Sequence, residues 1–204
     1  MKKHTRDVFS VLEVNTSPPS FDDMIALIQE DRKHLSYDVK WRSVQGPFTR
    51  GEHGETSYYD FNLFQEERYK PLMKHIMGHI YKAYREFVPE VNFMRYQAWW
   101  TVYEPGSLIP RHSHSNSHIS GAYYVRHPEG CGAIQFFNPF ANVINHFNHP
   151  DLIFQTATDI EIEPYEGMLL MFPGWLEHQT TPNTSDEEKI IVSFNLVLDE
   201  ESHG

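Results

Sequence analysis

Three histidines occupy positions from which they could bind one metal ion. His112 and His114 lie two residues apart in the segment RHSHS, and His178 follows in FPGWLEHQT. Residues i and i+2 of an extended strand point to the same face, so the first two imidazoles can meet the same ion. His178 comes after an apolar run and a Pro-Gly turn, from where its side chain can point back towards them. Histidine is the commonest metal ligand, so the pattern predicts a metal site.

These histidines also have an ordinary structural interpretation. The chain contains 13 histidines, and the first pair could lie on a solvated loop while His178 packs against Trp175. The metal hypothesis therefore depends on strands that bring the three residues together. His118 has the same parity as His112 and His114, and we expect it to contact substrate in the pocket rather than to bind the metal.

A non-haem Fe(II) site often uses two histidines and one carboxylate. The sequence offers two His-x-Glu pairs, His53 with Glu55 and His127 with Glu129. The first pair lies in a polar, glycine-rich segment far upstream of the predicted strands. The second contains Pro128, which would interrupt a strand ladder. We prefer neither pair.

The last predicted strand carries polar side chains on one face. Lys189, Ser193 and Asn195 share that face with Ile191 in KIIVSFNLVL. A lysine, a hydroxyl and an amide are unusual on the face of a core strand. They suit a small dicarboxylate, because the ammonium supplies the charge and the hydroxyl a hydrogen bond. Asn195 is a candidate substrate contact. The alternative is a lysine at a fraying strand end, next to an acidic run.

The elements that must position these residues change character along the chain. Residues 21–35 and 66–88 have helical apolar stripes, with Ser20 as the N-cap of the first and Pro71 in the first turn of the second. Residues 37–60 are predicted as loop and irregular strand. Short strands separated by turn signals follow, at 93–103, 119–125, 133–137, 159–163, 168–172 and 189–198. Helices followed by many short strands predict an α+β fold with a jelly-roll core.

The predicted organisation is a single domain over 1–204, with a helical N-terminal part at 1–92 and a jelly-roll core at 93–198. Segment 138–158 could be a substrate loop, in which His146 and His149 are candidate substrate contacts. Aromatic residues that could line a pocket are Trp99, Trp100, Phe136, Phe137, Phe140 and Trp175. Cys131, the only cysteine, excludes a disulfide framework and a multi-cysteine zinc site.

Composition limits the class of protein. The 204 residues are 40% hydrophobic and 14% aromatic, which excludes a disordered chain, and the net charge is -11. This charge disfavours nucleic acid as a partner. No apolar run reaches the roughly 20 residues of a membrane helix, and the N-terminus does not resemble a signal peptide. We expect a cytoplasmic protein, and a homodimer is compatible with the sequence.

Two segments resemble the 2-oxoglutarate- and iron(II)-dependent oxygenases. Segment 103–125, YEPGSLIPRHSHSNSHISGAYYV, has a His-x-His motif and then a Ser-Gly-x-Tyr-Tyr strand. Segment 166–195 contains the pattern Phe-Pro-x-Trp-x-x-His-x-Thr-x-Pro followed by a final strand. The sequence is most similar to a bacterial and phage group of 2OG-Fe(II) oxygenases with the His-x-His motif. The resemblance covers about residues 100–198 and implies a double-stranded β-helix, the jelly roll of that family.

The resemblance also implies site residues. His112 and His178 match the two iron-binding histidines, and His114 stands where most of the superfamily has Asp or Glu. Either His114 is the third ligand, or a water completes the site and His114 lies behind it. Lys189 stands where Arg usually binds the distal carboxylate of 2-oxoglutarate. Ser193, Tyr124 and Tyr103 match side chains that line the cosubstrate pocket, although ordinary aromatic core is an equal alternative for the tyrosines.

The implied cofactors are Fe(II), 2-oxoglutarate as cosubstrate, and O2. The implied activity is that of an oxidoreductase, a dioxygenase that hydroxylates an unidentified small molecule or peptide side chain. Two other functions fit a jelly roll with three histidines. One is a cupin-like metalloenzyme that does not use 2-oxoglutarate, against which Lys189 and Ser193 argue. The other is a non-enzymatic ligand-binding jelly roll.

Overall fold

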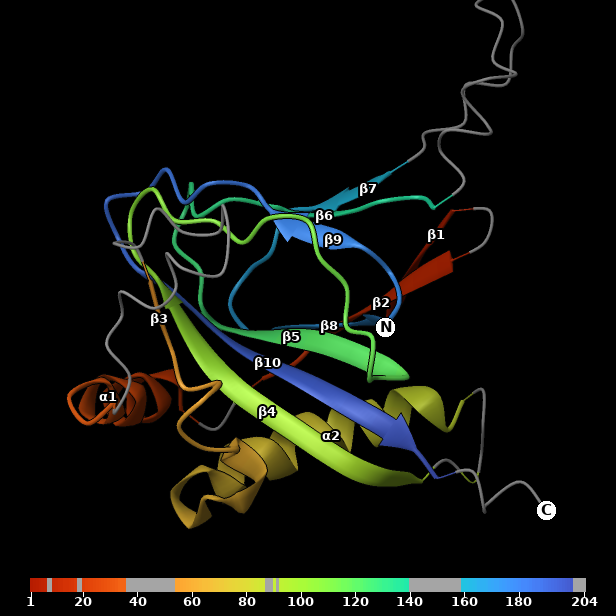
Figure 1. Ribbon diagram of the computed structural model, residues 1–204, viewed down its shortest axis with the longest axis horizontal. Helices are drawn as coiled ribbons and strands as arrows, with labels where there is room; N and C mark the ends of the chain where they lie inside the picture. The colour runs from red at the N-terminus through yellow and green to blue at the C-terminus, as the bar shows by residue number, and fades with distance from the viewer. Residues whose placement is uncertain are drawn as a thin grey trace, which may run out of the picture.

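The computed structural model describes residues 1–6, 9–17, 20–35, 54–86, 90, 92–139 and 159–199. Within them it has two α-helices, two one-turn 3₁₀ helices and ten strands (Figure 1). The helical elements are α1 (Phe21–Arg32), η2 (Leu63–Gln65), η3 (Glu67–Tyr69) and α2 (Lys70–Tyr84). The strands are β1 (Lys2–Arg6), β2 (Phe9–Asn15), β3 (Gly54–Thr56), β4 (Phe93–Tyr103), β5 (Ile119–Arg126), β6 (Ile134–Phe136), β7 (Ile160–Ile162), β8 (Met168–Pro173), β9 (His178–Thr180) and β10 (Lys189–Leu198).

The strands form two antiparallel sheets that face each other (Figure 1). The larger sheet has the order β1-β2-β8-β5-β10-β4-β3, and the smaller has β7-β6-β9. The segment around His112 lies along the free edge of β9, where an isolated β-bridge joins His112 to His178. From β4 onwards the chain therefore passes back and forth between the sheets. This is the double-stranded β-helix, and it confirms the predicted fold class.

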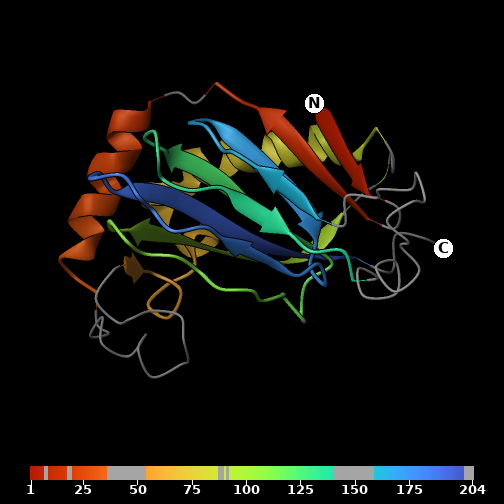
Figure 2. The same ribbon diagram turned by 90° about the horizontal axis from the view of Figure 1, so that it is seen from above.

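Two apolar layers hold the fold together. Helix α2 covers the outer face of the larger sheet, below β4, β10 and β5 in Figure 1 and behind the sheet in Figure 2, and α1 lies at one end of that sheet. That layer buries Ile76 and Ile80 of α2 against Trp100 and Val192 of the sheet. The second layer lies between the sheets and includes Tyr103, Tyr124 and Phe136. The alternation predicted for β10 is confirmed, because Ile190, Val192 and Phe194 belong to the first layer and Ile191 to the second.

The structure departs from the sequence prediction mainly before residue 92. Strands β1 and β2 extend the larger sheet beside β8, so the N-terminal part is not purely helical. Their sequence has no clear alternation of apolar and polar residues, and pairing holds them at the sheet edge, β2 with β8 and β1 with β2. The second helix begins at Lys70 instead of residue 66, because the preceding residues form η2 and η3. Of segment 37–60, residues 54–56 form β3, and 37–53 lie outside the described residues.

The local signals at the helix starts are confirmed. The Ser20 hydroxyl accepts a hydrogen bond from the backbone N–H of Asp23 at 3.1 Å, which caps α1. Pro71 lies in the first turn of α2, where its missing N–H costs no helical hydrogen bond. No helix among the described residues is long and apolar enough to cross a membrane.

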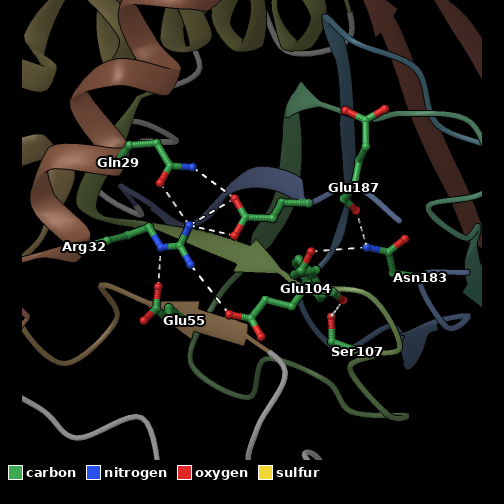
Figure 3. Close-up of polar contacts among 9 residues, drawn as sticks. Gln29, Arg32, Glu55, Glu104, Ser107, Asn183 and Glu187 are labelled. Carbon is green, nitrogen blue, oxygen red and sulfur yellow. Dashed lines mark hydrogen bonds and ion pairs between the residues drawn. The ribbon is translucent and has the colours of Figure 1, made fainter. Parts of the chain in front are cut away.

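Arg32 at the end of α1 joins three parts of the larger sheet (Figure 3). Its guanidinium pairs with Glu55 on β3, with Glu188 just before β10 at 2.8 Å, and with Glu104 just after β4 at 3.7 Å. Gln29 also donates to Glu188, at 3.0 Å. The Arg32 side chain is only 16% exposed, so solvent screens these contacts weakly. The cluster fixes α1 to the end of the sheet from which β10 starts.

We expect Arg32→Ala to lower the free energy of unfolding by about 3 kcal/mol, because it leaves three carboxylates close together without their cation. Urea unfolding followed by circular dichroism measures this. Lys33→Ala is the matched control and should leave the midpoint nearly unchanged, since the one ion pair of Lys33 among the described residues is with the exposed Glu30. Equal midpoints for the two variants would show that the Arg32 cluster does not stabilise the fold.

Candidate metal centre

The three predicted histidines meet at one end of the space between the sheets. His112 and His178 exchange two backbone hydrogen bonds of 3.0 and 2.9 Å, and their ring centroids lie 4.3 Å apart. His114 follows on the same loop, with its ring 5.2 Å from each of the other two. One nitrogen from each ring lies within 4.8 Å of the other two. Among the described residues, no carboxylate or thiol joins this group.

Hydrogen bonds at the Nδ1 atoms determine which ring nitrogen can bind a metal. The Nδ1–H of His112 donates to the carbonyl of Pro110 at 2.7 Å, and that of His178 to the carbonyl of Leu176 at 2.9 Å. A carbonyl can only accept, so Nδ1 carries the proton in both rings and Nε2 keeps its lone pair. His114 Nδ1 lies 2.7 Å from Asn195 Oδ1, an equivalent arrangement. All three rings therefore offer Nε2 as the ligand atom.

Electrostatics favour the neutral, ligand form of these rings. Burial lowers the pKa of His112, and for His178 burial and the neighbouring His112 lower it well below its ordinary value. Burial and the nearby His112 lower the pKa of His114 to about 4. Each imidazolium would lose its hydration and repel its neighbours. At neutral pH the cluster is therefore three neutral imidazoles.

One atom of the cluster shows directly that the site fits a metal. His114 Nε2 is buried and has no hydrogen-bond partner. A buried nitrogen lone pair without a donor costs free energy unless a ligand satisfies it. A divalent ion held by the three Nε2 atoms would do so. The donor set of three imidazoles suits Fe(II), Zn(II), Co(II) and Ni(II).

The turn that connects β8 to β9 supports the His114 loop. The backbone N–H of His114 donates to the carbonyl of Gly174 at 2.7 Å. A Cβ at Gly174 would lie 2.1 Å from the carbonyl oxygen of Ser117 and 2.9 Å from that of His114. Only glycine lets the two segments approach this closely. The Pro-Gly turn seen in the sequence therefore reverses the chain and also permits its close contact with the His114 loop.

A run of aromatic rings leads from the surface to the cluster. Trp99 on β4 stacks on His114, with centroids 6.2 Å apart. Tyr58 packs edge-on against Trp99 at 4.8 Å and against Tyr59 at 4.7 Å. Tyr58 and Tyr59 are 38% and 45% exposed. These rings give the molecule an apolar surface that is continuous with His114.

Lys189 is buried at the first residue of β10, with 1% of the residue exposed. Its Nζ donates to the carbonyl of Cys131 at 2.8 Å and lies 4.6 Å from the ring centre of Tyr103. Within the described part of the chain, that carbonyl is its one hydrogen-bond acceptor, which leaves two N–H groups for a ligand. Burial lowers the pKa of Lys189 to about 8, an effect that Cys131 and Glu163 partly offset.

The predicted partners of Lys189 surround this cation on neighbouring strands. Tyr103 on β4 is directly opposite Lys189, and Tyr124 on β5 is opposite Ile191. Burial raises the pKa of both phenols, so they remain neutral. Ser193 lies on the same face of β10, between Lys189 and Asn195, and is half-buried.

Other predicted residues have different surroundings. Asn195 binds His114, and the exposed His118 accepts a hydrogen bond from the backbone N–H of Leu198 at 2.9 Å, outside the metal cluster. Cys131 is buried, and burial raises the pKa of its thiol, which argues against a catalytic thiolate. His146 and His149 lie outside the described residues.

The aromatic residues that the sequence suggested for a pocket also differ in their surroundings, and only some of them contact the histidine cluster. Phe136 contacts His178, and Trp99 stacks on His114. Trp100 instead faces the helices, which corrects its assignment to a pocket wall. Phe137 lies under the guanidinium of Arg111, and Trp175 is 52% exposed. Phe140 lies outside the described residues.

Sequence reasoning missed Ser120. It is fully buried on β5, and its hydroxyl donates to Asn195 Oδ1 at 2.8 Å. The only signal in the sequence was a polar residue in an otherwise apolar strand, which does not reveal its partner.

Comparisons with known proteins agree with this geometry. Residues 97–195 match the family described as "Putative 2OG-Fe(II) oxygenase". No curated protein matches the chain in sequence. Among solved structures, a prolyl-4-hydroxylase from Pseudomonas putida has a TM-score of 0.55 at 15% identity, over 93% of this chain and 88% of the other.

Two further structures extend the comparison. A Trichoplax adhaerens prolyl hydroxylase, in complex with a peptide fragment of the hypoxia inducible factor oxygen degradation domain, has a TM-score of 0.60 at 12% identity, over 94% of this chain and 84% of the other. The non-haem alpha-ketoglutarate-dependent carbocyclase SnoK from nogalamycin biosynthesis has a TM-score of 0.63 at 12% identity, over 93% and 80%. At these identities the structural similarity establishes the fold.

Proposed function

The chain belongs to the 2OG-Fe(II) oxygenase family, which residues 97–195 match. From this premise we propose that His112, His114 and His178 are the iron ligands of the protein. The family makes the protein a 2-oxoglutarate-dependent oxygenase with Fe(II), 2-oxoglutarate and O2 as cofactors. The observation that carries the ligand assignment is the partly buried cluster, in which each Nδ1 faces an acceptor and each Nε2 remains available. A His-x-His motif thus replaces the more common pair of one histidine and one carboxylate.

Bound iron supplies the oxidising chemistry, in which 2-oxoglutarate and O2 become succinate and CO2 while one oxygen atom enters the substrate. The chain's own residues bind the metal and orient the imidazoles that hold it. The carbonyls of Pro110 and Leu176 hold two of the imidazoles in the tautomer that binds a metal. The apolar layer that includes Phe136 and Phe172 excludes water on the inner side of His178.

Lys189 is proposed to bind the distal carboxylate of 2-oxoglutarate. This carboxylate would satisfy the two remaining N–H groups and neutralise a buried charge, whose isolation is unfavourable. Ser193 lies on the same face of β10 and is proposed to donate a hydrogen bond to the cosubstrate. Tyr103 and Tyr124 line the same space, and their neutral hydroxyls can donate as well.

Succinate formation tests this function. The purified protein with Fe(II), O2 and 2-oxoglutarate should release succinate slowly even without a primary substrate, and His178→Ala should not. Equal succinate from both proteins would show that the reaction does not occur at this cluster. If the wild-type protein binds metal but not 2-oxoglutarate, the proposed function is wrong. The protein is then a three-histidine metalloenzyme that does not use 2-oxoglutarate.

The pKa of Lys189 makes the affinity for 2-oxoglutarate depend on pH. The ammonium form binds the carboxylate, and the free protein loses this proton as the pH rises through about 8. We therefore expect the dissociation constant of 2-oxoglutarate to be constant below pH 7 and to rise up to tenfold per pH unit above 8. Calorimetry on Co(II)-loaded protein at pH 7 and 9 measures this. Lys189→Met should remove this pH dependence. If 2-oxoglutarate binding by Lys189→Met still depends on pH, another group causes the dependence.

The proposed primary substrate is a small molecule or a peptide side chain. Two of the structural neighbours are prolyl hydroxylases, one of them in complex with a peptide. The exposed rings of Tyr58 and Tyr59, continuous with Trp99 and His114, suit an apolar or cyclic group next to the reacting carbon. The single-domain organisation, the cytoplasmic location, the lack of a nucleic-acid partner and a homodimer stay predictions from the sequence.

A further inference from the structure

We infer that Asn195 is a positioning residue for the third metal ligand: its side-chain oxygen, supported by Ser120, orients His114 so that Nε2 faces the metal. This inference rests on the proposed function, because it concerns the same histidine cluster. It replaces the sequence prediction of Asn195 as a substrate contact.

The hydrogen bonds of the three ligands differ in one respect. His112 and His178 donate to backbone carbonyls two residues before them, within their own segments. His114 instead donates to a side chain that is 81 positions away in sequence, at 2.7 Å. The orientation of His114 therefore depends on one residue that can be exchanged without altering the His114 loop itself.

Strand register explains how Asn195 reaches this place. On β10, Asn195 is directly opposite Ser120 of β5, and the Ser120 hydroxyl donates to the same Oδ1 atom at 2.8 Å. Asn195 Oδ1 thus accepts two hydrogen bonds, one from His114 Nδ1 and one from the Ser120 hydroxyl. Both donors favour an amide whose oxygen, not its nitrogen, faces His114.

The amide orientation has a chemical consequence. With Oδ1 as acceptor, His114 carries its proton on Nδ1 and keeps the Nε2 lone pair. If the amide presented Nδ2 instead, it would donate to Nδ1, the proton would move to Nε2, and the ring could not bind the ion. Residues behind metal ligands set the tautomer in this way, and their loss typically weakens metal binding 10- to 100-fold.

The same face of β10 carries Asn195 at the metal cluster and Lys189 at its first residue. One strand therefore aligns the third metal ligand and the proposed cosubstrate anchor. This arrangement explains why an amide occupies a position on a strand whose other face is entirely apolar core.

The test is the affinity of the full chain for Co(II), together with the visible absorption of the bound ion, which reports on its ligands. Asn195→Leu removes the acceptor at similar volume and should weaken Co(II) binding about 10- to 100-fold and change the spectrum. Asn195→Asp keeps an oxygen acceptor and should restore both. Gln179→Leu is the matched control, because Gln179 follows His178 on β9 but binds Gln135 at 2.7 Å instead of a metal ligand.

Two results would overturn the inference. Either Asn195→Leu binds Co(II) as the wild type does, or Asn195→Asp is as weak as Asn195→Leu, which would show that the acceptor oxygen is irrelevant. Both results leave the proposed function intact, since wild-type binding is unaffected. A wild-type chain that does not bind Co(II) would contradict the proposed function itself.

Discussion

Replacement of His114 by alanine should weaken Fe(II) binding about a hundredfold or more. Four-ligand structural zinc sites bind with about 10–16 kcal/mol, or roughly 3 kcal/mol per ligand, and about 3 kcal/mol corresponds to a hundredfold change in affinity. His114 is one of only three candidate ligands in the described cluster. The loss should therefore equal that of His112→Ala or His178→Ala. Equilibrium dialysis under anaerobic conditions measures the bound iron.

The controls are the two carboxylates that the sequence offered as alternative ligands. Glu55 pairs with Arg32, and Glu129 is not part of the histidine cluster. Glu129→Gln should leave iron binding unchanged. Glu55→Gln should leave it unchanged as well, and its unfolding midpoint is measured alongside because the substitution alters the Arg32 cluster. Full iron affinity in His114→Ala together with a loss in Glu129→Gln would exclude the three-histidine site.

Lys189→Met should weaken 2-oxoglutarate binding about 10- to 100-fold, because a charge-assisted hydrogen bond contributes about 1.5–3 kcal/mol. The variant should fold at least as well as the wild type. The pKa of Lys189 is about 8, below its ordinary 10.5, chiefly because of burial. A lowered lysine pKa means that the charged form opposes folding, so this group destabilises the fold below pH 8 and the cost declines as the pH rises from 8 to 10.5.

Calorimetry of 2-oxoglutarate binding and thermal unfolding of the metal-free chain separate the two effects. Lys70→Met, at an exposed lysine that pairs with Glu67 on the surface, is the control and should change neither quantity appreciably. A Lys189→Met variant that is stable and binds 2-oxoglutarate with wild-type affinity would remove Lys189 from the cosubstrate site.

Residue types and local spacing predicted which histidines the structure brings together. The i, i+2 spacing of His112 and His114 predicted a shared face, and the turn before His178 predicted a side chain directed back towards them. The face of β10 that carries Lys189 and Asn195 followed from the two-residue period of a strand. These features are local, because they depend on backbone geometry over a few residues.

The sequence by itself determined most strands of the jelly-roll core, the Ser20 cap and the position of Pro71 in the first turn of α2, because periodicity and capping act over short distances. Only the tertiary structure decided what each polar group contacts. Asn195 and Ser120 meet through the register of β10 and β5, and His118 lies beside Leu198 because their segments are neighbours in space. Strand β2 likewise required β8 as a partner, and β1 required β2. Such pairings join residues far apart in the chain, and long-range packing, rather than local propensity, selects them.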